Sequence, residues 1–282
     1  MALAENRYGK SRIRLVRVKR HAHRHDFSDW SVEILLRGDF ESCFKDGDNS
    51  KILATDTMKN TVYSLARDSA AGCIEEFGKE LVDFLLRRNP QVSHAEAKIA
   101  EKTWERALTS GKPHPTTFVQ SSGERATTKV ARAQGGGKLS ITSGIENLVI
   151  MKTAGSGFEG YIQDSLTTLP PTADRLFGTA LRANWRYGSE IVAFAPVRAK
   201  IREILLAEFA AHESKSVQHT LYAMGEQVLK EIPEADEIQL IMPNLHCLLV
   251  DLSRFGQDNP NEVFVPTDEP HGTIEATLRR KA

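Results

Sequence analysis

The feature that most constrains the fold of this chain is an order of hydrophobic patterns that occurs twice. In the first half, two alternating segments come first, two segments of helical spacing follow, and two more alternating segments come last. Alternation of this kind is typical of strands that have one wet face. The six segments are 11–20, 26–40, 55–67, 73–88, 93–107 and 116–133.

The second half repeats this order. Its helical segments begin at Pro196 and Ser216, and the second one stops before Pro233. The six segments are 139–153, 180–194, 196–210, 216–232, 237–256 and 261–274. Two such halves predict an α+β fold, in which antiparallel sheets carry helices on one face. The glycine run in "AQGGGK" divides the chain into expected domains at 1–135 and 136–282.

Composition excludes several classes of protein. The 282 residues contain 37 Lys plus Arg and 37 Asp plus Glu, and this balance argues against nucleic acid as a partner. No apolar run is long enough to span a membrane, and no signal peptide is visible. The three cysteines, Cys43, Cys73 and Cys247, form no CxxC motif. We therefore expect reduced thiols in a cytoplasmic protein.

The stretch "LIMPNLHCLLV" places two polar residues within an apolar strand pattern. Asn244 and His246 are two residues apart, so we expect their side chains to share one face. Pro243 precedes them, although a central strand rarely tolerates proline. Two interpretations are open: the pair serves a binding site, or it satisfies a bulge next to Pro243.

The motif "HAHRH" raises the question of a metal site. His21, His23 and His25 have the period of one strand face, and imidazole binds zinc or copper. The surrounding residues are highly charged and lie near an expected hairpin turn, without a carboxylate second shell. A solvated hairpin end is the favoured interpretation, and no metal site is predicted.

Two helix starts carry capping residues. Thr55 has the character of an N-cap and Asp56 suits the first turn. Ser216 is expected to cap the helix in which Val217 and Gln218 are the first residues. The backbone N–H groups there lack intrahelical partners and favour an anion. Simple capping explains each start equally well.

Two further residues have alternative roles. Phe158 lies between glycines in "SGFEG", where it either stacks on a flat ligand or fills the core. Arg175 either pairs with Asp174 or holds an anion. The chain contains no Walker, dinucleotide-binding or GxSxG fingerprint.

Several stretches together resemble the urate oxidase (uricase) family in order and spacing across nearly the whole chain. They are "YGK" at 8–10, "ATDTMKNTVY" at 54–63, "SGFEGY" at 156–161, "DRLFGT" at 174–179, "SVQHTLY" at 216–222, "MPNLH" at 242–246 and the segment 251–274. The resemblance implies two tandem tunnelling-fold (T-fold) domains and a homotetramer that encloses a β-barrel tunnel, with active sites at subunit interfaces. It also implies oxidation of urate by dioxygen and water to 5-hydroxyisourate and hydrogen peroxide, without metal, flavin or haem.

The resemblance assigns roles residue by residue. Arg175 and the Gln218 side chain resemble the clamp on the urate edge, next to the Val217 N–H group, and Phe158 resembles the stacking platform. Asn244 and Thr55 resemble the pair that holds dioxygen or water above the ring. Lys10, Thr55 and His246 resemble the proton relay, with Lys10 and Thr55 contributed by another subunit. Asp56 adjoins Thr55 and is counted with the substrate-binding residues.

Two competing functions remain at this point. One is a T-fold enzyme that acts on another purine or a pterin, such as a cyclohydrolase. Such enzymes need a metal or a Cys/His/Glu set, whereas Cys247 is expected to face away from His246. The other is a non-catalytic purine-binding oligomer, which would not require Lys10, Thr55 and His246. The chain ends in "LRRKA" without a peroxisomal address, which also favours the cytoplasm.

Overall fold

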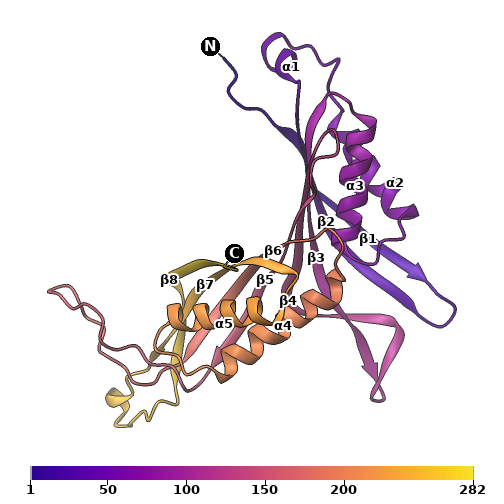
Figure 1. The fold of residues 1–282 in the computed structure, drawn as a ribbon. Helices are drawn as coiled ribbons and strands as arrows, with labels where there is room; N and C mark the ends of the chain where they lie inside the picture. Colours follow the sequence, from indigo (N-terminus) through magenta and orange to yellow (C-terminus); the bar gives the residue numbers. More distant parts are fainter. Residues whose placement is uncertain (1, 282) are drawn as a thin grey trace. The chain divides into compact units, whose positions relative to one another are not determined.

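The computed structural model describes residues 2–281, and its helices and strands follow the predicted order (Figure 1). The strands are hydrogen-bonded in sequence order, from β1 to β8. The pairs β1–β2, β2–β3, β3–β4 and β7–β8 are antiparallel, as predicted for an α+β fold. The elements are β1 (Tyr8–Arg20), β2 (His25–Gly38), α1 (Glu41–Asp46), α2 (Thr55–Asp68), α3 (Ile74–Arg88), β3 (Val92–Thr109), β4 (Lys112–Ala133), β5 (Ser140–Lys152), β6 (Phe177–Tyr187), α4 (Phe194–Ala211), α5 (Val217–Glu231), β7 (Ala235–Leu249), the 3₁₀ helix η1 (Ser253–Phe255) and β8 (Phe264–Arg279).

The chain forms two compact units. Unit 1 comprises Met1–Gly144 and Arg186–Pro196, and unit 2 comprises Ile145–Trp185 and Val197–Ala282. Each unit therefore takes residues from both β5 and β6. The division into tandem domains between residues 135 and 136 stays a prediction. The two compact units do not test it, because each is built from two separate segments of the chain. The predicted break itself is a turn, in which Gly135 and Gly136 have φ values of 79° and 83°.

In unit 1, helices α2 and α3 cover one face of the strands (Figure 1). Every second residue of β2 faces them and is almost fully buried, from Trp30 to Leu36. The ring of Trp30 lies 5.0 Å from that of Phe77 on α3. Burial of this apolar face stabilises the unit by about 25 cal/mol for each Å² removed from water. The buried residues of the two helices are Met58, Val62 and Ala66 on α2, and Ile74, Glu75, Phe77, Gly78, Leu81, Val82, Leu85 and Leu86 on α3.

Unit 2 is built in the same way. Helix α5 contacts β7 and β8, and its buried side contains Leu221, Met224 and Val228, which have helical spacing in the sequence. On α4 the predicted apolar stripe is also buried, and the ring of Phe209 lies 5.1 Å from that of Phe177. The helical spacing in the sequence therefore identified the core-facing side of both helices.

A glycine allows close approach of helix and strand in each unit. A Cβ atom at Gly78 on α3 would lie 2.7 Å from Cγ2 of Val130 on β4. A Cβ atom at Gly225 on α5 would lie 2.9 Å from Cδ1 of Leu278 on β8. Both distances are shorter than ordinary carbon–carbon contacts of about 3.5–4.0 Å. Helix α3 therefore packs on β4, and α5 packs on β8, by the same device.

Several boundaries differ from the prediction. The strand expected at 180–194 ends at Tyr187, because Glu190 turns inward and accepts hydrogen bonds from Leu139 N at 2.8 Å and Arg132 Nη2 at 3.1 Å. Helix α4 begins at Phe194 rather than at Pro196, which lies in the first turn. The short helices α1 and η1 were not predicted, since neither is long enough to show a period.

The "HAHRH" motif forms the turn between β1 and β2. The chain reverses where His21 N donates to Arg24 O at 2.9 Å, and both His21 and His23 are exposed. The interpretation as a solvated hairpin end is confirmed. No cluster of three or more His, Cys, Asp or Glu suited to a metal ion occurs between residues 2 and 281. No helix within the same range combines the length and apolar character that a membrane span requires.

Candidate active site

Lys10 lies on β1 at a place where the backbone is closely packed. Its neighbour Gly9 has no room for a side chain, because a Cβ atom there would lie 1.8 Å from Ile34 O on β2. The β1–β2 register shifts directly after Lys10, between Lys10 and Ile13. Bulges of this kind redirect side chains. The glycine of the "YGK" stretch is therefore a packing requirement of the strand that carries Lys10.

Tyr8 connects the start of β1 to the segment that leads into α2. Its hydroxyl accepts from Leu53 N at 2.8 Å and donates to Leu53 O at 3.2 Å. Burial raises the pKa of the Tyr8 phenol, and the hydrogen bond with the Leu53 backbone partly opposes this increase. The phenol thus fixes the strand of Lys10 against the chain two residues before Thr55.

Thr55 is the first residue of α2 and not its N-cap. The cap is Ala54, whose extended ψ of 136° ends the approaching chain and whose carbonyl accepts from Met58 N at 3.1 Å. The predicted capping role of Thr55 is therefore wrong by one residue, since the backbone conformation and not the side chain decides where this helix begins. The partly buried Thr55 is not required as a cap.

Asp56 is exposed beside Thr55 and faces basic neighbours. It pairs with Lys59 and accepts from Asn60 Nδ2 at 2.9 Å. The hydrogen bond and charge of Lys59 lower the pKa of the Asp56 carboxyl, against a small desolvation effect, and Asn60 and the charge of Lys10 lower it further. Thr55 and Asp56 are adjacent in the first turn of α2, and Lys10 lies on β1, which α2 contacts.

In unit 2, the loop of Phe158 is held by backbone hydrogen bonds to the segment before β6. Phe158 N donates to Thr172 O at 2.7 Å, and Thr172 N donates to Phe158 O at 3.1 Å. Arg175 N donates to Ser156 O at 2.7 Å, and Ser156 N donates to Asp174 Oδ1 at 2.9 Å. These four bonds place Phe158 and Arg175 side by side.

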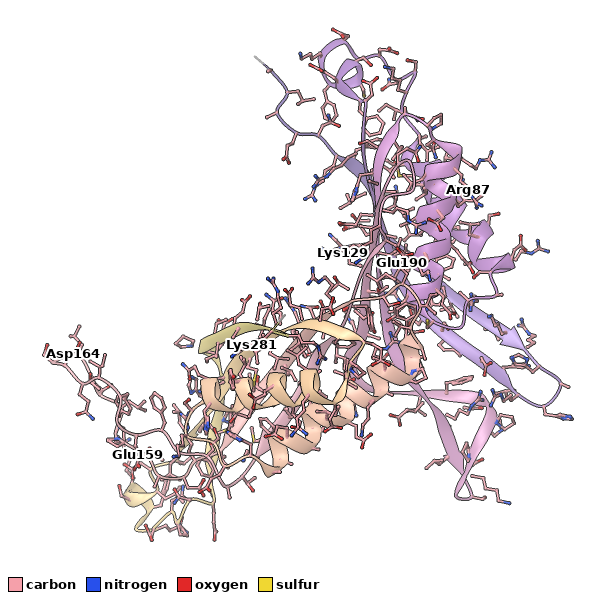
Figure 2. All side chains as sticks on the ribbon, in the orientation of Figure 1. Arg87, Lys129, Glu159, Asp164, Glu190 and Lys281 are labelled. Atoms are coloured by element: carbon pink, nitrogen blue, oxygen red, sulfur yellow. The ribbon has the colours of Figure 1, made fainter. Side chains whose placement is uncertain are left out.

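The Phe158 ring is only partly buried and does not belong to the core of unit 2. It stacks on Tyr161 with ring centroids 4.8 Å apart and an interplanar angle of 9°. The guanidinium carbon of Arg175 lies 5.3 Å from its centroid. The interpretation of Phe158 as a core residue is therefore wrong. Figure 2 labels Glu159, which follows Phe158, and Asp164 near the outer end of the same loop.

Arg175 does not use Asp174 as an ion-pair partner. The Asp174 carboxylate instead accepts from the Ser156 backbone, and Arg175 Nε is buried without a hydrogen-bond partner among the described residues. Burial lowers the pKa of the Arg175 guanidinium, a group that is effectively always protonated in proteins. A buried guanidinium with a free N–H donor favours an anionic partner.

The start of α5 agrees with its predicted capping. The Ser216 hydroxyl accepts from His219 N at 3.1 Å. Val217 is the first residue of the helix, and its side chain is buried, so only its backbone can reach a ligand. The Gln218 side chain is exposed. The N-terminus of α5 therefore presents the Val217 backbone N–H next to the side-chain amide of Gln218.

Asn244 and His246 share one face of β7, as predicted. Asn244 Nδ2 and His246 Nδ1 are 3.3 Å apart, and Asn244 is 8 % exposed. The β7–β8 register also shifts between them, from Asn244 opposite Gly272 to His246 opposite Thr267. A bulge is therefore present, but the partner of the Asn244 amide is the imidazole and not the bulged backbone.

The predicted residues form two groups. Lys10, Thr55 and Asp56 belong to unit 1, whereas Phe158, Arg175, Val217, Gln218, Asn244 and His246 belong to unit 2. The sequence analysis missed Ser156 and Ser214, which hold the loop of Phe158, and Tyr161, which stacks on it. The small residues around Phe158 in the sequence could have indicated a loop held closely by backbone hydrogen bonds.

Comparison with known proteins gives one consistent result. A family model described as Uricase matches residues 6–131 and 141–275. The uricase of Arthrobacter globiformis is 41% identical over 281 residues, which cover 100% of this chain and 91% of that protein. The uricase of Arabidopsis thaliana is 42% identical over 302 residues, with 98% of this chain and 95% of that protein covered.

Solved structures agree in fold. The crystal structure of the Arthrobacter globiformis uricase superposes with a TM-score of 0.94 at 40% identity, and the match covers 100% of this chain and 96% of that one. A urate oxidase from Bacillus sp. TB-90 superposes with a TM-score of 0.85 at 23% identity, which supports the fold alone. The family model and these relatives, matched over nearly the whole chain, show that the chain belongs to the uricase family.

Proposed function

We propose that this chain oxidises urate with dioxygen at a site shared between copies of the chain, with Lys10 and Thr55 from one copy and the urate-binding residues from another. Membership of the uricase family supports urate oxidase activity. The structural observation that carries the proposal is Arg175, a partly buried cation whose buried Nε has no hydrogen-bond partner among the described residues, beside the partly buried ring of Phe158. A flat anion satisfies both features at once, and urate is a flat anion at neutral pH.

The unit 2 residues bind the substrate. Arg175 presents parallel N–H donors to the anionic edge, in a geometry that lysine lacks. Gln218 supplies both a donor and an acceptor, and the Val217 N–H adds a donor at the positive end of α5. Phe158 stacks on the purine, a contact worth about 1–3 kcal/mol by analogy with bases on aromatic side chains.

The remaining residues move protons and hold the oxidant. Lys10, Thr55 and His246 form a relay in which the Thr55 hydroxyl donates and accepts at once. Asn244 and Thr55 hold dioxygen or water above the ring, and Asp56 completes the polar wall beside them. Urate loses two electrons to dioxygen and gains a hydroxyl from water, so that the products are 5-hydroxyisourate and hydrogen peroxide. The substrate supplies the electrons itself, and no cofactor is required.

We propose a homotetramer in which one copy contributes Lys10 and Thr55 and another contributes Arg175 and Phe158. Exposed apolar side chains on one part of unit 2 support burial by another copy. Leu248 on β7 is 58% exposed opposite Val265 on β8, and Val149 on β5 is 61% exposed. Patches of this kind are typical of protein–protein interfaces.

The free thiols of Cys43, Cys73 and Cys247 are consistent with the cytoplasm, which we propose as the compartment.

The direct test measures urate absorbance and peroxide together, with EDTA-treated protein in aerated buffer. Loss of urate with stoichiometric peroxide, unchanged by the chelator, is the expected result. Saturable binding of xanthine without urate turnover would contradict the proposal and would indicate a purine-binding oligomer instead.

Complementation tests the shared site. Lys10→Met and Arg175→Ala are each expected to be almost inactive. In randomly mixed tetramers, about a quarter of the shared sites would regain both wild-type residues, because each site draws them from different copies. Recovery of activity near that fraction supports sites at subunit interfaces. Mixed tetramers that remain as inactive as the parent variants would show that each site uses one copy only.

A further inference from the structure

The linker between α4 and α5, residues 212–216, is bonded to the loop that carries Phe158. Ser214 N donates to Gly155 O at 2.9 Å, and Gly157 N donates to Ser214 O at 2.8 Å. Ser214 is 3% exposed, and its hydroxyl donates to Ser216 O at 3.0 Å. The position of this linker therefore sets both the start of α5 and the loop of Phe158.

Two histidines connect the ends of this linker. His212 follows α4, where its N–H donates to Glu208 O at 2.9 Å, and His219 lies in the first turn of α5. Nε2 of His212 and Nδ1 of His219 are 3.2 Å apart, and the ring centroids are 4.3 Å apart. The pair thus links the end of α4 directly to the helix turn that contains Val217 and Gln218.

The direction of the hydrogen bond follows from a third contact. The backbone N–H of Lys215 lies 3.4 Å from His219 Nδ1, and a backbone N–H can only donate. His219 Nδ1 is therefore an acceptor, and the proton between the rings is on His212 Nε2. One imidazole nitrogen of His219 accepts from both Lys215 and His212, so this arrangement requires an unprotonated Nδ1.

We propose that His212 and His219 are positioning residues for urate, which hold the Val217 N–H and the Gln218 side chain in register with Phe158 and Arg175. This inference rests on the proposed function, since it assigns Val217 and Gln218 to the substrate. The backbone of the linker supplies the mechanical connection, because Ser214 and Ser156 join it to the loop and Arg175 N bonds to Ser156 O. Neither histidine is expected to touch the substrate.

The charges around the pair favour its neutral form. Burial lowers the pKa of His212, the nearby His219 and Lys152 lower it further, and Glu208 acts in the opposite direction. Lys152 Nζ donates to His212 O, and Glu208 Oε1 lies 3.7 Å from His212 Nδ1, beyond a hydrogen bond. Lys215 and the exposed Glu213 are the other charged residues of the linker.

The sign of the pH effect follows from the lowered pKa of His212. The neutral His212 ring contributes fully above the ordinary imidazole pKa of about 6.5, and its contribution is lost as the pH falls from that value through the lowered pKa of His212. The affinity for urate is therefore expected to fall on the acid side.

The test compares His219→Ala with His219→Asn. The Asn side-chain oxygen can replace Nδ1 as an acceptor and does not titrate, so it keeps both contacts. We expect His219→Ala to raise KM for urate about fivefold, the effect of one net hydrogen bond, with kcat within about twofold of wild type. His219→Asn should restore KM at neutral pH. His23→Ala in the exposed β1–β2 turn is the matched histidine control.

Isothermal titration with xanthine, which stands in for urate without being oxidised, separates this inference from the proposed function. Weaker xanthine binding by His219→Ala supports the positioning role even if the wild-type protein fails to oxidise urate. Unchanged KM and xanthine affinity in His219→Ala would overturn it. A parallel loss of kcat and thermal stability that His219→Asn does not restore would also overturn it, since the pair would then be merely structural.

Discussion

The two groups of site residues are held in different ways. Lys10 and Thr55 belong to regular elements, a strand and the first turn of a helix, where both are partly buried and the neighbouring Asp56 pairs with Lys59. Phe158 and Arg175 lie on irregular segments, where backbone hydrogen bonds through Ser156 and Ser214 replace regular structure. A relay needs side chains that exchange protons with water, whereas a clamp needs donors held at fixed distances. The difference predicts that variants of Lys10 and Thr55 change turnover, whereas variants of Phe158 and Arg175 change binding.

The largest expected effect comes from Lys10→Met. Loss of a group that transfers protons typically reduces turnover by about 10²–10⁴-fold, and we expect kcat to fall within this range. The dissociation constant for xanthine should stay within about threefold of wild type, because Lys10 takes no part in the clamp. Stopped-flow turnover and xanthine titration give the two values. If binding collapses and bound urate still reacts at the normal rate, the assignment of unit 1 to proton transfer fails.

Arg175→Ala is the complementary change in unit 2. It removes charge-assisted hydrogen bonds worth about 1.5–3 kcal/mol, so the affinity for xanthine is expected to fall by about 10–150-fold. Arg175→Lys should restore only part of this loss, because an ammonium group cannot form the planar fork. Titration calorimetry on both variants provides the measurement. Equal affinity in Arg175→Lys and wild type would show that charge alone, and not geometry, defines the clamp.

The smallest expected effects concern the glycines that both units use under their helices. In a helix interior, replacement of glycine by alanine raises stability by about 1 kcal/mol, but an overpacked contact lowers it by about 1–3 kcal/mol. Gly78 faces Val130, whose branched side chain has little freedom, whereas Gly225 faces the more adaptable end of Leu278. Gly78→Ala should therefore lower the free energy of unfolding by about 1–2 kcal/mol, and Gly225→Ala should be nearly neutral. Urea unfolding of both variants tests this prediction. A larger loss of unfolding free energy in Gly225→Ala than in Gly78→Ala would contradict it.

Much of the fold followed from periodicity, and the exceptions have local causes. The duplicated order of strands and helices and the buried faces of α3 and α5 were predicted, since apolar spacing reports directly which side of an element is buried. The start of α2 was misplaced by one residue because Ala54 took the cap position by its backbone angles. The end of β6 was missed because Glu190 is drawn inward by Arg132 and the Leu139 N–H, two partners more than 50 residues away in the chain.

The sequence by itself determined the class of fold and the family, because these depend on residue types and on their order. It also determined that Asn244 and His246 share a face, since a strand alternates its side chains. Only the tertiary structure decided that the Asp174 carboxylate bonds to Ser156 N and not to Arg175. It also decided that the partly exposed Phe158 ring stacks on Tyr161, and that the rings of His212 and His219 are in contact. These contacts join residues through backbone groups and ring positions, which have no periodic trace in a sequence and are fixed only when distant segments pack together.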